Sequence, residues 1–349
     1  MRFFSLAWIG VAASAALCSP AGSPPDSLAH RSSLPSSFSW TSSQPYIWPK
    51  DKARGDYGIK DPSVIFHDGK YHVFASTAKK AGYSLVYLSF ADWSEAESAT
   101  FHYLDMTPIG KGYRAAPQVF YHSKQKIWYL VYQAHGASFS TNSDITNPNG
   151  WTAPQSFYTS TPASIQSRMG RGQWVDMWTI CESDLCHMFS SDDAGNLYRA
   201  QTSASDFPKG FGQPTVVMHE ANMWKLYEAS CVYNVGGGSY LLIVEAAGND
   251  GWRYFRSWTS NSLSGQWKSL ASTEQNPFIR SNNVKFADGK AWTKAFSHGE
   301  VVRSNVDETM TIDPCKMQFL YQGYDPSANG ADYNNLPYKL ALLTQEGGC

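Results

Sequence analysis

Short apolar stretches separated by polar turns run through most of the chain, and helical periodicity is scarce. The clearest pair of stretches lies at 63–66 and 71–76, on either side of the turn HDGK. Turns rich in Gly, Asn and Asp between such stretches are typical of β-hairpins. The pattern therefore predicts an all-β protein.

Five such pairs follow one another along the chain. Their first strands are centred on Val64, Val119, Ile180, Val232 and Val302, which lie 55, 61, 52 and 70 residues apart. Several short strands repeated about every 50 residues are typical of a β-propeller. We therefore predict an all-β, five-bladed β-propeller over residues 50–345. A sandwich or jelly roll with similar turn spacing is the alternative.

Three acidic residues open three of these first strands: Asp61 in KDPSVIF, Asp176 in WVDMWTI and Glu228 in LYEASCVY. In a propeller the first strand of each blade lines the central channel, so these carboxyl groups should converge at one end, at places equivalent to Gln118 and to residues 298–300. Two carboxyl groups facing each other across a sugar are the usual equipment for hydrolysing a glycosidic bond. Each acid has a structural alternative when it is taken singly. An Asp before a proline, as at Asp61, is also typical of a turn. Asp176 and Glu228 could be residues of the rim that form salt bridges with Lys or Arg.

The composition favours a sugar ligand over nucleic acid or an anionic membrane. The formal net charge is -1, and charged residues make up 16% of the chain, below the usual ~25%. No basic block occurs. The chain holds 13 Trp, 20 Tyr and 18 Phe, and aromatic planes suit the C–H faces of sugar rings. Most of these aromatics are nevertheless expected in the core and in cross-strand pairs.

The N-terminus has the pattern of a secretory signal peptide. Arg2 supplies a positive charge, and an apolar stretch continues to Leu17. That stretch is too short for a comfortable membrane span, and no other segment qualifies. We therefore expect a soluble, secreted protein with a signal peptide at 1–18 (cleavage between 15 and 21), a flexible Ser/Pro-rich lead-in at 19–37 and a single catalytic domain at 38–349.

Secretion changes how the cysteines are interpreted, because disulfides persist outside the cell. Cys181 and Cys186 flank the turn ESDL and are candidates for a disulfide across a hairpin. Cys315 and Cys349 are candidates for a C-terminal disulfide. Cys231 follows the third acidic motif closely and is expected as a buried free thiol. No paired C-x-x-C spacing supports a metal site built from cysteines.

The motifs, in their order along the chain, resemble glycoside hydrolase family 62. The matching segments are KDPSVIFHDGKYHVFAS, GYRAAPQVFY, WVDMWTIC, LYEASCVY, YLLIVEA, RYFRSWT, SHGE and YNNLPYKLALLT. The resemblance implies a secreted α-L-arabinofuranosidase that removes side groups from arabinoxylan with inversion, on a five-bladed propeller. An arabinanase or β-xylosidase of the related family 43 is the main alternative, and a propeller that binds xylan without catalysis is a further one.

The resemblance implies a different task for each acid. Asp61 is the expected general base, which deprotonates a water molecule, and Glu228 is the expected general acid, which protonates the leaving oxygen. Asp176 is expected to orient these groups and to raise the pKa of Glu228 by like-charge repulsion. Inverting pairs of this kind stand roughly 6.5–9.5 Å apart.

Five further residues are expected to bind the substrate: Lys60, Gln118, Trp178, Arg256 and Tyr338. Each has a structural alternative. The lysine and the arginine are also typical of surface salt bridges, and the glutamine of a channel residue bonded to backbone. The tryptophan is also typical of core packing, and the tyrosine of a residue that closes the last blade.

His298 in SHGE should lie near the channel axis, where the resemblance implies a calcium ion with mostly water ligands. The alternative is a hydrogen-bonded core histidine. The chemistry itself requires no cofactor. We expect a monomer whose partner is arabinoxylan polysaccharide or oligosaccharide, with no nucleic acid or membrane partner. The sequence leaves open which xylose hydroxyl carries the arabinose.

Overall fold

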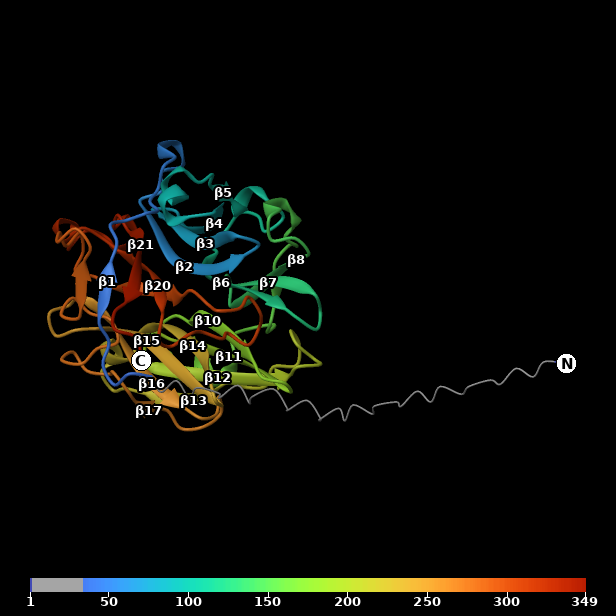
Figure 1. Cartoon of the computed structure of the whole chain (residues 1–349). Coiled ribbons are helices and arrows are strands. Elements are labelled where there is room, and N and C mark those ends of the chain that lie inside the picture. Colours follow the sequence, from blue (N-terminus) through green and yellow to red (C-terminus); the bar gives the residue numbers. More distant parts are fainter. Residues whose placement is uncertain (2–33) are drawn as a thin grey trace. The chain divides into compact units, whose positions relative to one another are not determined.

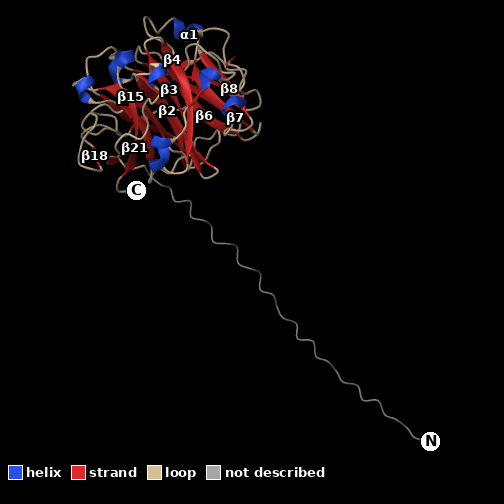
Figure 2. Ribbon diagram, turned by 90° about the horizontal axis from the view of Figure 1, so that it is seen from above, coloured by secondary structure: helices blue, strands red, loops and turns tan. Residues whose placement is uncertain are grey.

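Five sheets surround a central axis, and each sheet is one blade of a β-propeller (Figure 1, Figure 2). The computed structural model describes Met1 and residues 34–349. Apart from Met1, the predicted signal peptide lies outside the described residues, and so does most of the predicted lead-in. Residues 34–349 belong to one compact unit. The predicted fold, an all-β five-bladed propeller, is confirmed.

Each of the first four blades is a meander of four strands in chain order, and the first strands of neighbouring blades pack against one another. Blade 1 consists of β2 (Gly58–His67), β3 (Lys70–Lys79), β4 (Gly82–Phe90) and β5 (His102–Tyr103), and blade 2 of β6 (Ala115–His122), β7 (Ile127–Gln133), β8 (Ala137–Asn142) and β9 (Gln155–Ser156). Blade 3 consists of β10 (Val175–Cys181), β11 (Leu185–Ser191), β12 (Asn196–Ser203) and β13 (Thr215–His219), and blade 4 of β14 (Glu228–Gly236), β15 (Ser239–Ala247), β16 (Arg253–Ser260) and β17 (Lys268–Ser269).

The fifth blade is completed by the beginning of the folded unit. β1 (Trp40–Ser42) pairs antiparallel with β21 (Lys339–Gln345) and parallel with β18 (Val284–Phe286). The inner strands of this blade are β20 (Gln318–Gly323) and β19 (Ser297–Val301). In Figure 1 the blue β1 accordingly lies beside the red β21. The ring is therefore closed by hydrogen bonds between the two ends of the folded unit.

The helical turns within residues 34–349 are short and lie in the loops between strands. They are α1 (Ala163–Gln166), η1 (Lys52–Arg54), η2 (Trp93–Ser98), η3 (Leu104–Met106), η4 (Pro148–Gly150), η5 (Met223–Lys225), η6 (Pro326–Ala328) and η7 (Tyr333–Asn335).

The inner strands are buried on both faces. β10 is buried along its whole length, and β2 is buried at every residue from Gly58 to Ile65. A strand covered on both sides shows a continuous apolar run and not a strict alternation. This burial explains why the first strand of each blade was the clearest signal in the sequence.

Every inner strand carries an irregularity at the same height, near one end of the channel. The ladder is interrupted after Lys60, Ala115, Val175, Glu228 and Ser297. The residues that follow are Asp61, Ala116, Asp176, Ala229 and His298, and the first four have left-handed φ angles of 48°, 50°, 57° and 56°. Alanine adopts the same left-handed φ angle as aspartate at this position. The geometry of the blade therefore imposes the angle, and the carboxyl group does not cause it.

The repeat corrects one prediction. We expected Gln118 and Glu228 to occupy the same place in their strands as Asp61 and Asp176. Instead, Glu228 precedes its bulge and Gln118 follows its bulge, where the ladder resumes. A β-bulge adds residues to a strand and so shifts the alternation of side chains between its two faces. Counting every second residue therefore does not identify equivalent positions in different blades.

One level further along the channel, side chains join each inner strand to the next blade. The hydrogen bonds are Val119 N–H to Ser63 Oγ (2.9 Å), Gln118 to both backbone groups of Thr179 (2.7 Å each), Trp178 Nε1–H to Val232 O (2.8 Å), Cys231 Sγ to Gly299 O (3.5 Å) and Ser63 Oγ to Glu300 Oε2 (2.6 Å). We call these five side chains (Ser63, Gln118, Trp178, Cys231 and Glu300) the channel ring.

The cysteines pair as predicted. Cys181 and Cys186 form a disulfide across the β10–β11 hairpin, and Cys315 and Cys349 form the C-terminal disulfide. Cys231 is a buried free thiol. Its place in the channel ring explains its burial.

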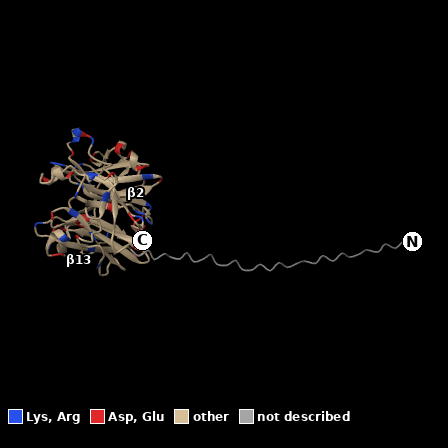
Figure 3. Cartoon of the chain, turned by 60° about the vertical axis from the view of Figure 1, so that its left-hand side comes forward, with Lys and Arg blue, Asp and Glu red and all other residues tan. Residues whose placement is uncertain are grey.

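Acidic and basic side chains are interspersed over the folded unit and do not separate by sign (Figure 3). Among the residues that the structure describes, no helix is both long and apolar enough to cross a bilayer.

Candidate active site

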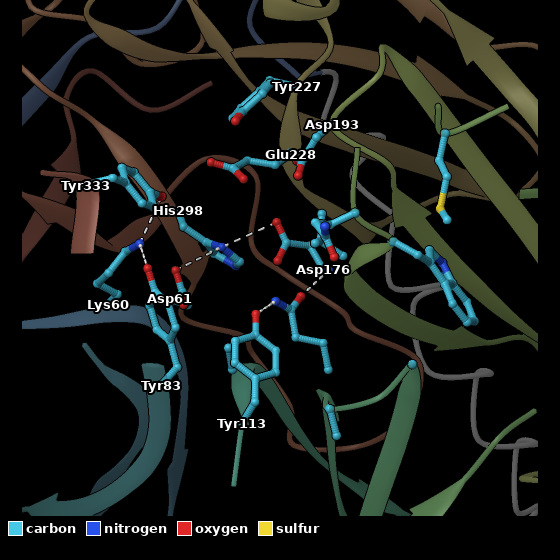
Figure 4. Close-up of a pocket in the computed structure, with 18 of the residues that line it drawn as sticks. Lys60, Asp61, Tyr83, Tyr113, Asp176, Asp193, Tyr227, Glu228, His298 and Tyr333 are labelled. Carbon is cyan, nitrogen blue, oxygen red and sulfur yellow. Dashed lines mark hydrogen bonds and ion pairs between the residues drawn. The ribbon is translucent and has the colours of Figure 1, made fainter. Parts of the chain in front are cut away.

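A cavity of about 770 Å³ opens at the bulge end of the channel. Its polar lining contains carboxyl groups, basic side chains and tyrosines from all five blades and their loops (Figure 4). The lining includes Lys60, Asp61, Tyr83, Tyr113, Gln133, Asp176, Asp193, Trp224, Tyr227, Glu228, Arg253, His298 and Tyr333. The three acids singled out from the sequence therefore meet in one cavity.

Asp61 and Asp176 are held by their backbone. Both are bulge residues, and the bulge leaves their N–H groups without a partner in the strand ladder. The N–H of Asp61 donates to Gln322 Oε1 at 2.6 Å, and the N–H of Asp176 donates to Gln133 Oε1 at 2.9 Å. Each acceptor comes from the preceding blade, so the position of each carboxyl group depends on the packing of two blades.

His298 lies between these two aspartates (Figure 4). Its Nδ1 is 3.4 Å from Asp61 Oδ1 and 3.7 Å from Asp176 Oδ2. The N–H of His298 donates to Glu245 Oε2 at 2.7 Å. The imidazole can therefore pair with either carboxylate when it carries a proton.

Glu228 faces the cavity from the first position of β14. Arg253 Nη1 is 3.4 Å from Glu228 Oε1 and 3.2 Å from Glu245 Oε1. One guanidinium therefore forms ion pairs with two carboxyl groups. Asp176 Oδ2 accepts a hydrogen bond of 2.7 Å from the N–H of Ala229, the neighbour of Glu228. This bond ties the second acid of the site to the strand that carries the third.

Two carboxyl groups of the site, Asp176 and Glu245, have a raised affinity for protons. Burial, and then the negative charges of Glu228 and Asp61, raise the pKa of Asp176 well above its usual value. Burial also raises the pKa of Glu245 to about 7, although the charge of Arg253 opposes this shift. Since repulsion between like charges is mutual, the cluster retains a proton at a pH at which isolated carboxyl groups are ionised.

Lys60 enters the cavity through a cluster of tyrosines. Its Nζ donates to Tyr333 Oη at 2.9 Å and to Tyr83 Oη at 3.2 Å. The same Nζ lies 4.1 Å from the centre of the Tyr333 ring, in cation–π geometry. The Tyr333 side chain itself is exposed. The structure thus places Lys60 beside the first acid, where a sugar hydroxyl can reach it.

Gln118 and Trp178, which we expected to bind substrate, do not line the cavity. Both belong to the channel ring below the cavity. There their side chains form hydrogen bonds with backbone atoms of the next blade. Their exposed fractions are 1% and 4%. The structural alternatives given for these two residues therefore describe them correctly.

Arg256 and Tyr338 also lie away from the cavity lining. Arg256 Nη1 is 3.1 Å from Glu220 Oε1, and its Nε donates to Ser272 O at 2.7 Å. Tyr338 is buried where blade 5 meets blade 1, and its carbonyl oxygen accepts the N–H of Ile59 at 3.0 Å. Both side chains are already occupied by structural contacts.

Several cavity residues were missed in the sequence. Arg253 lies in the same motif as Arg256, and Tyr333 in the same motif as Tyr338. Arg253 and Arg256 are an odd number of positions apart, so they face opposite sides of β16, and no local signal identifies the inward side. Asp193, Trp224 and Tyr227 come from turns, which carry no periodic signal.

The side chains do not form a calcium site by themselves. Within residues 34–349, no three His, Cys, Asp or Glu side chains are grouped so that they could hold a metal ion. The imidazole of His298 faces two carboxylates that the mechanism below uses. Calcium prefers six to eight oxygen ligands, a set that these residues do not supply. The calcium site stays a prediction, and no catalytic step passes through it.

Comparison with known proteins gives a consistent result. The sequence model of glycosyl hydrolase family 62 matches residues 39–344. Over 309 residues the chain is 42% identical to α-L-arabinofuranosidase C of Cellvibrio japonicus, a match that covers 87% of this chain and 46% of that protein. The chain therefore spans less than half the length of this curated relative.

Two solved structures resemble the whole folded unit. The catalytic domain of a GH62 α-L-arabinofuranosidase from Coprinopsis cinerea is 58% identical, with a TM-score of 0.89 over 90% of this chain and 99% of that one. A GH62 hydrolase in complex with xylotriose is 50% identical, with a TM-score of 0.87 over 91% of this chain and 99% of that one.

Proposed function

Because the chain belongs to glycosyl hydrolase family 62, we propose that it is a secreted α-L-arabinofuranosidase. Its proposed reaction is the hydrolysis of terminal, non-reducing α-L-arabinofuranosyl side groups of arabinoxylan, with inversion. The observation that carries this proposal is the meeting of Asp61, Asp176 and Glu228 in one cavity. The arabinofuranosidase relatives support the activity, and the relative in complex with xylotriose supports a xylan substrate.

The proposed reaction is a single displacement. Glu228 donates its proton to the xylosyl oxygen while the bond from that oxygen to the anomeric carbon breaks. Asp61 takes a proton from a water molecule, and the water oxygen bonds to the anomeric carbon from the opposite face. The products are free arabinose of inverted configuration and an unsubstituted xylose hydroxyl. No covalent sugar–enzyme intermediate forms.

Asp176 is the proposed modulating acid. It accepts the N–H of Ala229, the neighbour of Glu228, and its Oδ2 lies 3.7 Å from His298 Nδ1. Since like charges repel, the carboxyl groups of Asp176 and Glu228 are not easily ionised together, and the pair retains the proton that the reaction needs. Arg253 acts in the opposite direction, because it lies 3.4 Å from Glu228 Oε1. We propose that Glu245 limits this effect by sharing the guanidinium.

Lys60 is the proposed substrate-binding residue beside the base. Its ammonium group donates to two tyrosine hydroxyl groups and can donate a third hydrogen bond to a sugar hydroxyl. The exposed ring of Tyr333 at the rim offers a plane for a xylose ring.

Replacement of the acid and of the base should separate their roles. We expect Asp61→Asn to lower kcat at least about 10³-fold on every substrate, since the attacking water loses its base. Glu228→Gln should lose as much on arabinoxylan but far less on an aryl arabinofuranoside whose leaving group needs no proton. These assays would use enzyme secreted into the culture medium. N-terminal sequencing of that enzyme would identify the residue at which the signal peptide is cleaved.

Proton NMR of the fresh product completes this test. The first arabinose signal should be that of the inverted anomer. Asp184→Asn removes an exposed carboxyl group of blade 3 and serves as the control with unchanged rates. Initial release of the retained anomer, or a fully active Asp61→Asn enzyme, would contradict the mechanism. Binding of xylan without any release of sugar would instead indicate a non-catalytic propeller.

A further inference from the structure

The turn between β11 and β12 contains two adjacent aspartates with opposite surroundings. Asp192 is fully buried and uses both carboxyl oxygens. Its Oδ1 accepts the N–H groups of Ala194 (2.9 Å) and Asn196 (3.1 Å), and its Oδ2 accepts from Asn196 Nδ2 and Tyr198 Oη at 2.7 Å each. Asp192 therefore holds the turn in shape.

Asp193 is directed into the active-site cavity instead. Its φ angle of 54° lies in the left-handed region, which is costly for a residue with a side chain. Its Oδ1 is buried and has no hydrogen-bond partner. Within the part of the chain that the structure describes, no Lys, Arg or His nitrogen lies within 4 Å of this carboxyl group. This oxygen is therefore available for a hydrogen bond to a group that enters the cavity.

The position of Asp193 shows where such a group would be. Figure 4 places Asp193 beside Glu228 and above Asp176, at the side of the cavity away from Lys60. Asp193 thus lines the same cavity as the proposed acid and base, which a bound sugar would occupy. The hydroxyl groups of that sugar are the polar atoms that can reach the unpartnered oxygen.

We propose that Asp193 binds the arabinofuranosyl group, acting as a neutral carboxylic acid that donates a hydrogen bond to one of its hydroxyls. This inference rests on the proposed function and adds a substrate-binding residue that the sequence motifs do not contain. Asp193 takes no part in the proton transfers. It contributes binding energy that holds the sugar in line with the water and the leaving oxygen.

The charges around Asp193 support the neutral form. Burial, and then the carboxylates of Glu228 and Asp176, raise its pKa to about 8, and Asp192 acts in the same direction. Arg253, on β16, opposes the shift. Tyr227, on the segment before β14, is a further ionisable neighbour. Below about pH 8 the group is thus a hydrogen-bond donor, and above it the group is an acceptor that repels Glu228.

Two variants test the proposal on an aryl arabinofuranoside. Asp193→Ala should raise KM and the inhibition constant of free arabinose about tenfold, with kcat within about threefold of wild type, because a hydrogen bond made in both ground and transition state is lost. Asp193→Asn, whose amide is a neutral donor, should keep both constants near the wild-type values. The wild-type KM should rise as the pH passes about 8, and that of Asp193→Asn should not.

Thermal unfolding excludes a merely structural role. Asp193→Ala should be at least as stable as wild type, since the carboxyl group has no partner in the free protein. Asp184→Ala, an exposed carboxyl group in another turn of blade 3, is the control with unchanged KM. Unchanged binding constants in Asp193→Ala would overturn the inference, and so would a loss in kcat alone in both variants. A wild-type enzyme that releases no arabinose would contradict the proposed function instead.

Discussion

At the scale of single residues, the bulge N–H groups explain how the acids are positioned. Four of the five donate to a side chain on the second strand of the preceding blade. These bonds run from Asp61 to Gln322 (2.6 Å), from Ala116 to Ser76 (2.9 Å), from Asp176 to Gln133 (2.9 Å) and from His298 to Glu245 (2.7 Å). The fifth, Ala229, donates to the carboxyl group of Asp176. The repeat is broken only where the carboxyl group of Asp176 replaces the usual acceptor.

Gln322 is therefore expected to support catalysis without touching the substrate. Gln322→Met removes the acceptor of the Asp61 N–H, which costs about 1–3 kcal/mol in the free energy of unfolding. The displaced base should lower kcat at least about tenfold, because small misplacements of a catalytic group are costly. Calorimetry and steady-state kinetics measure the two effects.

Gln345→Met is the matched control. Gln345 lies in the same blade, is buried, accepts the backbone N–H of Met317 at 2.9 Å and does not line the cavity. The Gln345→Met variant should lose a similar amount of free energy of unfolding and keep the wild-type kcat. Equal loss of kcat in both variants would show that Gln322 affects activity only through global stability.

At the scale of elements, the channel ring joins neighbouring inner strands. Its link from β19 to β2 contains a buried ion pair: Arg303 Nε lies 3.0 Å from Glu300 Oε1, and Ser63 Oγ donates to Glu300 Oε2. Arg303 Nη2 also donates to Val119 O in blade 2 at 2.5 Å. Burial raises the pKa of Glu300 to about 7 despite the arginine, so the pair carries a desolvation cost.

Removal of the arginine alone should be harmful. Arg303→Met leaves Glu300 buried without its cation and should cost about 3–5 kcal/mol in the free energy of unfolding. The double variant Arg303→Met/Glu300→Gln should recover part of this loss, because an amide still accepts from Ser63 and carries no charge. Denaturant unfolding measures both variants. A double variant less stable than the single one would contradict this account.

At the scale of the whole molecule, the propeller depends on contacts between the two ends of the folded unit. Trp40 of β1 is fully buried, and its Nε1–H donates to Phe278 O at 2.7 Å. Its ring packs on Phe278 at a centroid distance of 5.3 Å. A blade assembled from both ends of the folded unit closes the ring of blades through strand pairing between β1 and β21.

Trp40→Ala should accordingly destabilise the entire propeller. We expect a loss of about 3–5 kcal/mol in the free energy of unfolding, typical of a buried aromatic residue, and one cooperative transition at a lower temperature. Phe66→Ala, at a half-exposed position of blade 1, should cost much less. A separate early transition, with four blades still folded, would argue against ring closure as the stabilising feature.

The sequence predicted the repeat, the fold, the family and the disulfides, and it identified three acids that do share one cavity. In two motifs the residue that it singled out, Arg256 or Tyr338, lies outside the cavity lining, and a neighbour, Arg253 or Tyr333, belongs to that lining. The choice between neighbouring residues depends on which side of a strand faces the axis. That side is set by bulges and by packing against another blade.

The sequence by itself determined how the chain divides into blades. Apolar runs and polar turns are local features, so their spacing can be measured along the sequence without the structure. Only the tertiary structure decided which side chains reach the cavity. Asp61, Asp176 and Glu228 are more than 50 residues apart from one another along the chain, and their separation in space depends on hydrogen bonds between blades. Asp193 shows this most clearly, since its turn places it among acids from other strands that no local pattern connects to it.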